Sequence, residues 1–430
     1  MSLNVGIVGL SHLGLITGVG LASRGANILG FETDASLVAK LARFELPVFE
    51  ENLSELLHEA GSRVRFTANQ ADLGGCEVLY IARDVPTSDK NISDPTPILE
   101  LFEKILPSLK TGATLVIHSQ VSPGFTRALG ALVERENRNI QLYYQVETLV
   151  FGIAMSRMLN PERYIVGCKD PKAPLPDAYQ KVLSLFDCPV LPMRYESAEL
   201  AKISINMFLV SSVITTSTLA ELCEEIGAEW GEIAPSLRLD KRIGPHAYLQ
   251  PGLGIAGGNL ERDLVTVQSL AREHGTDSSV IEAWFSNAVY RRDWVLRKLS
   301  SVVFSKQDDP LIGIWGIAYK PDTHSIKNSP SVALIDSLKA QRVRAYDPMV
   351  KLGERAANRV VQAESALHAC EGADVLVLIT PWSEFKKIPA GEVANAMKGR
   401  VVLDPFGALS SRDFDQAGFT VHTLGKKTEK

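Results

Sequence analysis

The stretch "NVGIVGLSHLG", residues 4–14, decides the fold of this chain. Residues 4–9 form a short run, rich in valine and isoleucine, that is typical of a buried strand. The apolar spacing over residues 13–25 predicts a helix that stops at Gly25, and "NILGFETD", residues 27–34, predicts a second strand. Strand, helix and strand in this order predict a βαβ unit.

The same alternation continues outward from this unit. Strand-like runs lie at residues 76–82, "CEVLYIA", and at residues 113–119, "ATLVIHS". Helical stretches lie at residues 96–109 and 125–137, and the pattern continues to about residue 193. Strands that alternate with helices predict a parallel, doubly wound sheet.

The character of the chain changes after this sheet. Residues 197–227 predict one long, almost wholly apolar helix ended by Gly227, and a second long helix is expected over residues 278–306. A helix that is apolar on all sides is expected to be buried between domains or subunits. A new β-rich start, "PLIGIWGIAYKPDT", begins at residue 310 and predicts a second alternating region.

The chain of 430 residues is longer than one ordinary core supports, so several domains are expected. The pattern predicts an α/β protein with two Rossmann-like doubly wound domains joined by a long central helical region. The expected bounds are residues 1–193, 194–306 and 307–430.

Composition narrows the function class. A net charge of -5 argues against a nucleic-acid partner, whose phosphates need a basic patch. The five cysteines are scattered singly without CxxC spacing, which excludes a zinc ribbon and fits a reducing compartment. The eight histidines are dispersed, so no metal site is expected. The start has no signal-peptide pattern and no uninterrupted apolar run is long enough to span a membrane. These features predict a cytoplasmic enzyme of small metabolites.

The segment "GLSHLG", residues 9–14, resembles a dinucleotide fingerprint placed between strand and helix. Such a fingerprint has glycine at three positions, and here Ser11 stands at the middle one. Glu32 follows about 20 residues later, where an acid accepts ribose hydroxyls and repels a 2′-phosphate, which favours NAD over NADP. The alternative is a βαβ unit that only folds. The cofactor-binding residues predicted from this stretch are Gly9, Ser11, His12, Leu13, Gly14 and Glu32.

Two further stretches carry polar groups in apolar or glycine-rich surroundings. Lys202 and Asn206 are four residues apart, which puts them on one face of the long helix. A partly buried lysine beside a pocket can stabilise a developing alkoxide, and the alternative is a lysine in a salt bridge. The second stretch comprises "LDKRIGP" and the glycine-rich "PGLGIAGGNLERDL", residues 251–264, which reads as a loop. Its alternative is a solvated loop, but Asp240, Arg242 and Arg262 could grip a phosphate and Asp263 could act on a proton.

Taken together, the chain resembles the UDP-glucose/GDP-mannose dehydrogenase family over nearly its full length. The resemblance lies in the order and spacing of seven segments: "LPVFEENLSELL" (46–57), "VSPGFT" (121–126), "LNPERYIVG" (159–167), "AELAKISINMFL" (198–209), "LDKRIGPHAYLQPGLGIAGGNLERD" (239–263), "GIAYKPDTHSIKNSP" (316–330) and "AYDP" (345–348). It implies an NAD-binding N-terminal domain, a central dimerising helix and a C-terminal domain that grips the nucleotide diphosphate. It also implies a homodimer that oxidises a sugar CH₂OH to a carboxylate with two NAD.

The resemblance also assigns site residues. The family's catalytic lysine and asparagine correspond to Lys202 and Asn206, its loop aspartate to Asp263 and the first glutamate of its "NPEF" segment to Glu147. An arginine that family members lend to the neighbouring subunit corresponds to Arg242. The residues expected to bind substrate are Arg242, Tyr248, Gly257, Lys320 and Lys327.

Departures from the family pattern concentrate where the chemistry is expected. Asn259 stands where the family has its cysteine nucleophile, Gln120 replaces a threonine of the cofactor site, and Phe151 replaces the second glutamate. Two aspartates and an arginine of the C-terminal domain correspond to His324, Ser325 and Lys327. We read these changes as altered or lost function.

The missing thiol leaves three outcomes open. Covalent catalysis needs a nucleophile with an accessible anionic form, and an asparagine amide has none near neutral pH. The protein could stop at the aldehyde, could oxidise the hydrated aldehyde with Asn259 orienting the diol, or could bind nucleotide sugar without turnover. The retained Lys202, Asn206, Asp263 and Glu147 favour an atypical NAD-dependent nucleotide-sugar dehydrogenase, with a non-catalytic binding or regulatory subunit as the alternative.

Overall fold

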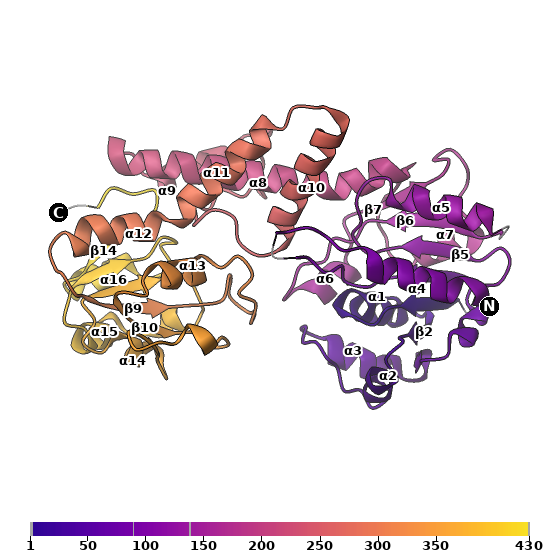
Figure 1. Ribbon diagram of the computed structural model, residues 1–430, viewed down its shortest axis with the longest axis horizontal. Coiled ribbons are helices and arrows are strands. Elements are labelled where there is room, and N and C mark those ends of the chain that lie inside the picture. The colour runs from indigo at the N-terminus through magenta and orange to yellow at the C-terminus, as the bar shows by residue number, and fades with distance from the viewer. Residues whose placement is uncertain (1–2, 89, 137–138, 429–430) are drawn as a thin grey trace. The chain divides into compact units, whose positions relative to one another are not determined.

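The computed structural model describes residues 3–88, 90–136 and 139–428. The chain forms two compact units, one that ends at Ile205 and one that begins at Asn206 (Figure 1). The boundary between the two units lies inside a helix, and not in a flexible linker. The expected three-part domain bounds stay a prediction.

The first unit contains an eight-stranded sheet in the order β3-β2-β1-β4-β5-β6-β7-β8. All neighbouring strands are parallel except β6 and β7, which pair antiparallel. The strands are β1 (Asn4–Val8), β2 (Asn27–Phe31), β3 (Val64–Thr67), β4 (Val78–Ile81), β5 (Thr114–Ile117), β6 (Gln141–Gln145), β7 (Tyr164–Cys168) and β8 (Val190–Arg194).

Alternating side chains of these strands pack into two cores, one on each face of the sheet. Val5 and Ile7 of β1 belong to the core under α1, α3, α6 and α7, whereas Val8 belongs to the core under α4 and α5. Helices therefore cover both faces, as the doubly wound prediction requires. The helices are α1 (His12–Ser23), α2 (Ala35–Leu41), α3 (Leu53–Ala60), α4 (Thr96–Ile105), α5 (Phe125–Arg135), α6 (Ala154–Leu159) and α7 (Asp177–Leu183), with short 3₁₀ turns η1 (Gly61–Arg63), η2 (Gln70–Gly75) and η3 (Leu106–Ser108).

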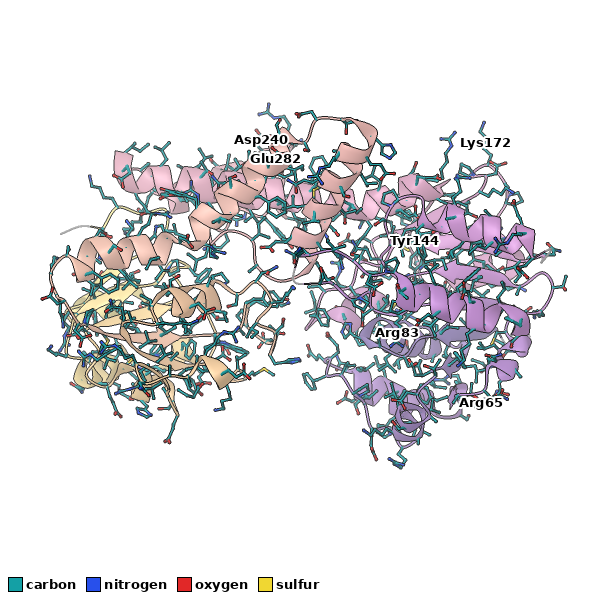
Figure 2. The ribbon with its side chains drawn as sticks, viewed as in Figure 1. Arg65, Arg83, Tyr144, Lys172, Asp240 and Glu282 are labelled. Carbon is teal, nitrogen blue, oxygen red and sulfur yellow. The ribbon has the colours of Figure 1, made fainter. Side chains whose placement is uncertain are left out.

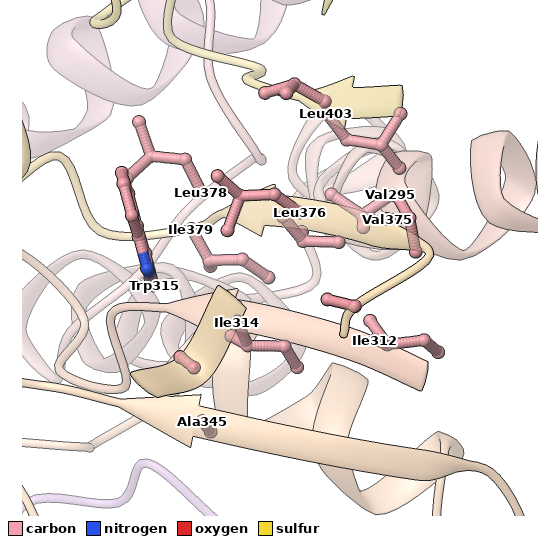
Figure 3. Packing of buried hydrophobic residues seen from close by; sticks show 14 of the residues in the cluster. Val295, Ile312, Ile314, Trp315, Ala345, Val375, Leu376, Leu378, Ile379 and Leu403 are labelled. Atoms are coloured by element: carbon pink, nitrogen blue, oxygen red, sulfur yellow. The ribbon is translucent and has the colours of Figure 1, made fainter. Parts of the chain in front are cut away.

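The second unit contains a parallel six-stranded sheet in the order β11-β10-β9-β12-β13-β14. Figure 3 shows part of its core, where Trp315 and Leu378 lie at the ends of β9 and β12. The strands are β9 (Leu311–Trp315), β10 (Arg342–Tyr346), β11 (Val360–Gln362), β12 (Val375–Leu378), β13 (Val401–Leu403) and β14 (Thr420–His422). Its helices and turns are α13 (Pro330–Ser337), α14 (Ala366–Cys370), α15 (Ala390–Ala396), α16 (Ser411–Gln416), η5 (Gly353–Arg355) and η6 (Phe385–Lys387).

The long apolar helix is confirmed as α8 (Tyr195–Ile226), which is followed directly by Gly227 in a left-handed conformation (φ +79°). In the single chain, Phe208 and Ile226 of α8 are 76% and 66% exposed, and the expectation that this helix is buried between domains or subunits stays a prediction. Among the described residues, α8 is the one helix long and apolar enough to cross a membrane by length and composition. That property alone is weak evidence, since core helices share it.

Two expectations for the helical region are wrong in their bounds. The single helix over residues 278–306 is divided into α11 (Ser279–Arg292), α12 (Trp294–Leu299) and the π-helical turn η4 (Ser300–Phe304). The division falls at Asp293, a poor helix former whose φ of -85° and ψ of 9° interrupt the helix. The glycine-rich loop ends early, because α10 (Asn259–His274) begins at Asn259. Helix α10 starts directly after Gly258. Helix α9 (Trp230–Leu239) precedes the glycine-rich loop.

Candidate functional site

The turn after β1 has the geometry of a phosphate-binding turn. Gly9 has a φ of +89°, and a Cβ there would lie 2.8 Å from the Cβ of Arg83. A Cβ on Gly14 would lie 1.9 Å from the carbonyl oxygen of Gly9. Glycine is therefore required by conformation at the first position and by close approach at the third.

Ser11, at the middle position, turns its side chain toward the loop after β4. Its hydroxyl accepts a hydrogen bond from the Asp84 N–H at 2.9 Å and approaches the Ala82 carbonyl at 3.5 Å. Ser11 is the N-cap residue of α1 but makes no side-chain cap bond, and the first turn of α1 contains no acid. The first N–H groups of a helix have no partner inside it and attract anions. This turn therefore fits the pyrophosphate of a dinucleotide.

The next residue, His12, fastens the turn to two other segments. Its Nε2 lies 2.8 Å from Oε1 of the buried Glu50, and its ring packs on Phe151 at a centroid distance of 4.3 Å. Glu50 also accepts hydrogen bonds from the N–H groups of Gly152 and Ala154, at 2.9 Å and 3.1 Å. Glu50 was missed by sequence reasoning, although it lies in one of the segments that carry the family resemblance.

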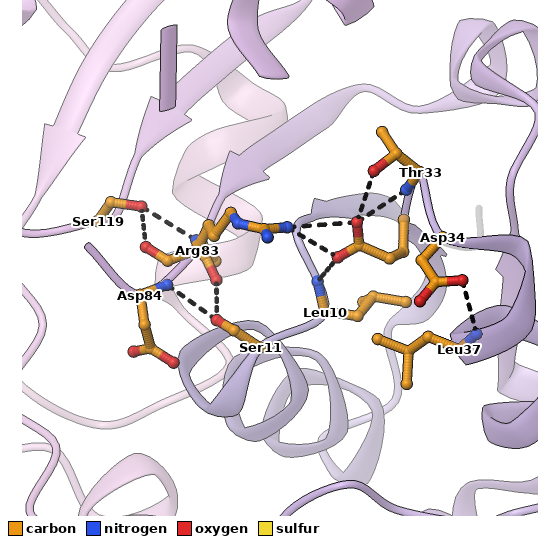
Figure 4. A network of polar contacts seen from close by, with 10 residues as sticks. Leu10, Ser11, Thr33, Asp34, Leu37, Arg83, Asp84 and Ser119 are labelled. Atoms are coloured by element: carbon orange, nitrogen blue, oxygen red, sulfur yellow. Dashed lines mark hydrogen bonds and ion pairs between the residues drawn. The ribbon is translucent and has the colours of Figure 1, made fainter. Parts of the chain in front are cut away.

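Glu32 lies at the end of β2, where an acid was expected, but its carboxylate is already occupied. It accepts five hydrogen bonds, from Leu10 N, from Thr33 N and Oγ1, and from NH1 of Arg83 to both oxygens (Figure 4). Burial acts to raise the pKa of Glu32, but the N–H groups of Leu10 and Thr33 and the charge of Arg83 outweigh it, so the pKa is lowered. The role of Glu32 toward a ribose stays a prediction. Arg83, labelled in Figure 2, was missed by sequence reasoning.

Lys202 has the anionic partner that a partly buried lysine needs. Its Nζ lies 2.6 Å from Oε1 of Glu147 and donates to the Glu147 carbonyl at 3.0 Å, and both side chains are nearly buried. Glu147 also accepts from Leu149 N at 2.9 Å. Burial acts to raise the pKa of Glu147, but the charge and the hydrogen bond of Lys202 outweigh it and the pKa is lowered. The pair is thus an ammonium held by a carboxylate.

A small cavity of about 30 Å³ lies beside this pair in the first unit. His118 and Gln145 line it with Glu147, and His118 Nδ1 lies 2.9 Å from the Gln145 carbonyl. Burial lowers the pKa of His118, so the imidazole is neutral at pH 7. Gln120, the last residue predicted for the cofactor, is half-buried and follows β5.

The second unit holds the other predicted catalytic residues. Asn206 Nδ2 donates to Oδ2 of Asp263 at 2.5 Å, and Arg262 Nε donates to Oδ1 at 3.1 Å. Asp263 is 1% exposed, so its carboxylate is buried among these donors. Asn259 is exposed at the start of α10, four residues before Asp263 and hence on the same helical face. If Arg262 binds a phosphate, as the sequence suggested, the phosphate competes with Asp263 for the Arg262 guanidinium.

The glycine-rich segment before α10 contacts the segment after β9. Gly257, with a φ of +83°, donates its N–H to the Lys327 carbonyl at 3.2 Å, and Asn328 donates to the Gly257 carbonyl at 2.8 Å. A Cβ on Gly257 would lie 2.9 Å from the ring of Tyr319. This contact brings the predicted substrate residues Gly257 and Lys327 together, with Lys320 half-buried in the same segment. Asn328 was missed, because a lone asparagine after a lysine gives no signal in sequence.

Two other predicted substrate residues are exposed in the helical region. Arg242 pairs with Asp240 at 2.6 Å just after α9, and its side chain is 89% exposed (Asp240 is labelled in Figure 2). Tyr248 is 51% exposed, and its carbonyl accepts a hydrogen bond from Thr216 at 3.1 Å.

The cysteine thiols do not have the surroundings of a reactive nucleophile. Four of the five cysteines are buried and Cys188 is half-buried. Burial raises the pKa of Cys76 to about 11 and that of Cys370 to about 12, so these thiols are neutral at pH 7. Among residues 3–88, 90–136 and 139–428, no cluster of three histidine, cysteine or acidic side chains could hold a metal.

Two sheets in the Rossmann strand order, the first with a glycine-rich phosphate turn, define a dinucleotide-binding α/β protein. Residues 3–186 match the NAD binding domain of the UDP-glucose/GDP-mannose dehydrogenase family. Residues 196–287 match the central domain and residues 313–411 the UDP binding domain of the same family. The chain belongs to this family, and its cofactor is NAD.

Individual relatives agree along the full chain. The UDP-glucose 6-dehydrogenases of Pseudomonas aeruginosa and Rickettsia bellii are 27% and 26% identical, over 98% and 99% of this chain and 97% and 100% of theirs. The fold resembles a UDP-glucose dehydrogenase from Pyrobaculum islandicum, with a TM-score of 0.83, 22% identity and 96% of each chain covered. It also resembles a UDP-D-ManNAc dehydrogenase from Pyrococcus horikoshii, with a TM-score of 0.85, 21% identity and 99% of each chain covered.

Proposed function

We propose that the protein oxidises a primary alcohol of a UDP-sugar to the aldehyde and stops there. The observation that carries this proposal is Asn259, an exposed amide at the start of α10, which the family resemblance aligns with the family's thiol nucleophile. An amide cannot form the covalent adduct through which an aldehyde loses a second hydride. The UDP binding domain match supports a UDP-sugar, with Lys320 and Lys327 as cations for the diphosphate.

The turn of Gly9, Ser11, His12, Leu13 and Gly14 fits NAD, which accepts a hydride when bound. The N–H groups at the start of α1 would hold its pyrophosphate, and the Glu50 carboxylate beside His12 fixes the turn. Gln120 follows β5, at the carboxyl edge of the parallel strands where the ligands of such sheets bind.

The chain's own groups then serve one two-electron step. Lys202, held as an ammonium by Glu147, stabilises the alkoxide that forms as the hydroxyl loses its proton. Asn206 orients Asp263, and a water held by Asp263 takes that proton. One hydride leaves the carbon, so one alcohol yields one aldehyde, one NADH and one proton. Arg242 and Tyr248, both exposed, remain for the substrate or for a second subunit.

The deciding experiment counts NADH per substrate consumed and identifies the product by mass, over UDP- and GDP-sugars. We expect one NADH and an aldehyde from the wild type, and a second NADH with an acid from Asn259→Cys. The matched control is Asn259→Ser, which keeps a small polar side chain without a thiolate and should give only the aldehyde. Two NADH and an acid from the wild type would overturn the proposal, because water would then replace the thiol.

A second candidate function is a non-catalytic nucleotide-sugar-binding subunit. The observation that favours it is the occupied carboxylate of Glu32, which leaves the expected ribose acceptor engaged by Arg83. In the same experiment this function predicts no NADH from any sugar together with a thermal shift on addition of UDP-sugar.

We also propose a cytoplasmic homodimer. The apolar side chains Phe208, Leu222 and Ile226 of α8 are exposed in the single chain and support a second copy as their cover. Light scattering of the wild type should give twice the chain mass, and Phe208→Glu should shift it toward the mass of one chain. A monomeric wild type would overturn this part.

A further inference from the structure

Arg83 is placed rigidly at the carboxyl edge of the first sheet. It follows β4 by two residues, its N–H donates to Ser119 Oγ at 3.0 Å and its carbonyl accepts from the same hydroxyl at 2.7 Å. Its Cβ lies against Gly9. The backbone is therefore fixed, and the side chain extends over the phosphate turn toward Glu32 (Figure 4).

The contact with Arg83 changes what Glu32 offers to a ligand. A carboxylate has about four lone-pair positions, and Glu32 already accepts five hydrogen bonds. A ribose diol that donates to Glu32 must displace a donor that is already present. The arginine charge also compensates the glutamate charge, so the repulsion that normally excludes a 2′-phosphate is weakened.

Arg83 itself presents donors for an anion. A guanidinium has five N–H groups, and within the described residues only NH1 of Arg83 has an acceptor, namely Glu32. The side chain is 36% exposed, so part of Arg83 is open to a ligand. Nε and NH2 form the planar fork that binds phosphate through two parallel hydrogen bonds.

The neighbouring acid does not oppose this arrangement directly. Asp34 accepts from the N–H groups of Ser36 and Leu37 at 2.8 Å and 3.3 Å, at the start of α2. In Figure 4 a dashed line joins the Asp34 carboxylate to Leu37, and none joins it to Arg83. Lys40, on the same helix, interacts with Asp34 electrostatically and reduces its field further.

We propose that Arg83 determines cofactor specificity and that the protein accepts NADP as well as NAD. The inference rests on the phosphate turn as the cofactor site, and it reverses the discrimination that Glu32 alone predicts. The 2′-phosphate takes the Nε and NH2 fork of Arg83 while NH1 stays on Glu32.

The test measures the dissociation constants of NADH and NADPH by cofactor fluorescence on the full-length protein, so it does not depend on turnover. We expect NADPH to bind within about tenfold of NADH. Arg83→Ala should weaken NADPH relative to NADH by about tenfold or more, since a charge-assisted pair of hydrogen bonds is lost. Arg83→Lys keeps the positive charge but lacks the planar pair of N–H donors. Its NADPH affinity relative to NADH should lie between those of the wild type and Arg83→Ala.

Arg135→Ala is the matched control, because it removes an exposed arginine on α5 that no part of the proposed site uses. It should leave the NADPH to NADH ratio unchanged. A wild type that prefers NADH by more than about a hundredfold overturns the inference and leaves the proposed function intact, as does an unchanged ratio in Arg83→Ala. Binding of neither cofactor overturns both.

Discussion

The two sheets of the molecule solve one folding problem with different residues. In each sheet a glycine with positive φ follows the first strand, Gly9 at +89° and Gly316 at +96°. An acid, Glu32 or Asp347, comes directly after the second strand. Glu32 and Asp347 each accept five hydrogen bonds, and in both cases some come from the turn after the first strand. The acid in each sheet therefore has a structural role, which is to hold the turn after the first strand in place.

What differs is the group that covers the acid. Asp347 is covered by the indole N–H of Trp382, at 3.1 Å, and Trp382 is 6% exposed. Glu32 is covered by Arg83, whose side chain is 36% exposed. An acid at the end of a second strand is thus no proof of a cofactor site, and the exposed cation above it is the more informative residue.

The largest contrast is expected on removing the two acids. Asp347→Ala leaves the buried N–H groups of Ile317, Ala318 and Trp382 without an acceptor and should destabilise the second unit by about 4 kcal/mol. Glu32→Ala should cost about 2 kcal/mol, because Arg83 can turn to water. All five tryptophans lie in the second unit, so urea unfolding followed by tryptophan fluorescence isolates the first effect and circular dichroism reports both. Equal losses would remove the distinction between the two acids.

Adding a Cβ to Gly316 or Gly9 should give the second largest loss of stability. Gly316→Ala places a methyl group 2.3 Å from the Cβ of Thr380, and Gly9→Ala places one 2.8 Å from the Cβ of Arg83. Positive φ and overlap together should cost about 3 kcal/mol for Gly316→Ala and about 2 kcal/mol for Gly9→Ala. Melting curves of both variants test the order. The matched control is Gly391→Ala, where a Cβ meets nothing within 4 Å and the residue is helical.

The pH dependence of Glu32 should be smaller and has a definite sign. Its pKa in the folded state is lowered from the usual 4.5, so ionised Glu32 stabilises the fold above pH 4.5 and loses this contribution as the pH falls through the folded pKa. The difference in unfolding free energy between wild type and Glu32→Gln should be about 1 kcal/mol at pH 7 and shrink below pH 4.5. A difference that grows on acidification would contradict the lowered pKa.

The smallest effect is expected at Ser11. The corresponding position of the second sheet, two residues after its glycine, is Ala318, which has no hydroxyl. Ser11→Ala loses the bond to Asp84 N and should cost about 0.5 kcal/mol without altering the turn. A loss above 2 kcal/mol, measured by urea unfolding, would show that the loop after β4 depends on Ser11.

The spacing of apolar residues predicted those helices and strands whose formation depends on neighbouring residues in the sequence. The βαβ unit from Asn4 to Phe31 and the helix from Tyr195 to Ile226 follow from residue spacing and from the glycines beyond them. The start of α10 at Asn259 was missed, because the glycines before it indicated a loop.

Side-chain partners were less predictable than elements. The family resemblance placed Lys202 and Glu147 in the site, but their ion pair joins residues 55 positions apart in sequence. The cover of Glu32 by Arg83 likewise depends on the sheet placing β4 beside β1. Such contacts come from topology, which residue spacing along the chain does not encode.

The burial of the cysteines has a practical consequence for oxidative chemistry. Burial raises the pKa of all five thiols, and Cys76, Cys168, Cys223 and Cys370 are also shielded, so the thiolate that peroxide and alkylating reagents attack is disfavoured at neutral pH. A dehydrogenase that relies on a thiolate is inactivated when that sulfur is oxidised, whereas we propose that this chain carries the Asn259 amide in its place. The wild type should keep its activity in peroxide, and an introduced Asn259→Cys thiol should react with a maleimide faster than the buried Cys76, Cys168, Cys223 and Cys370.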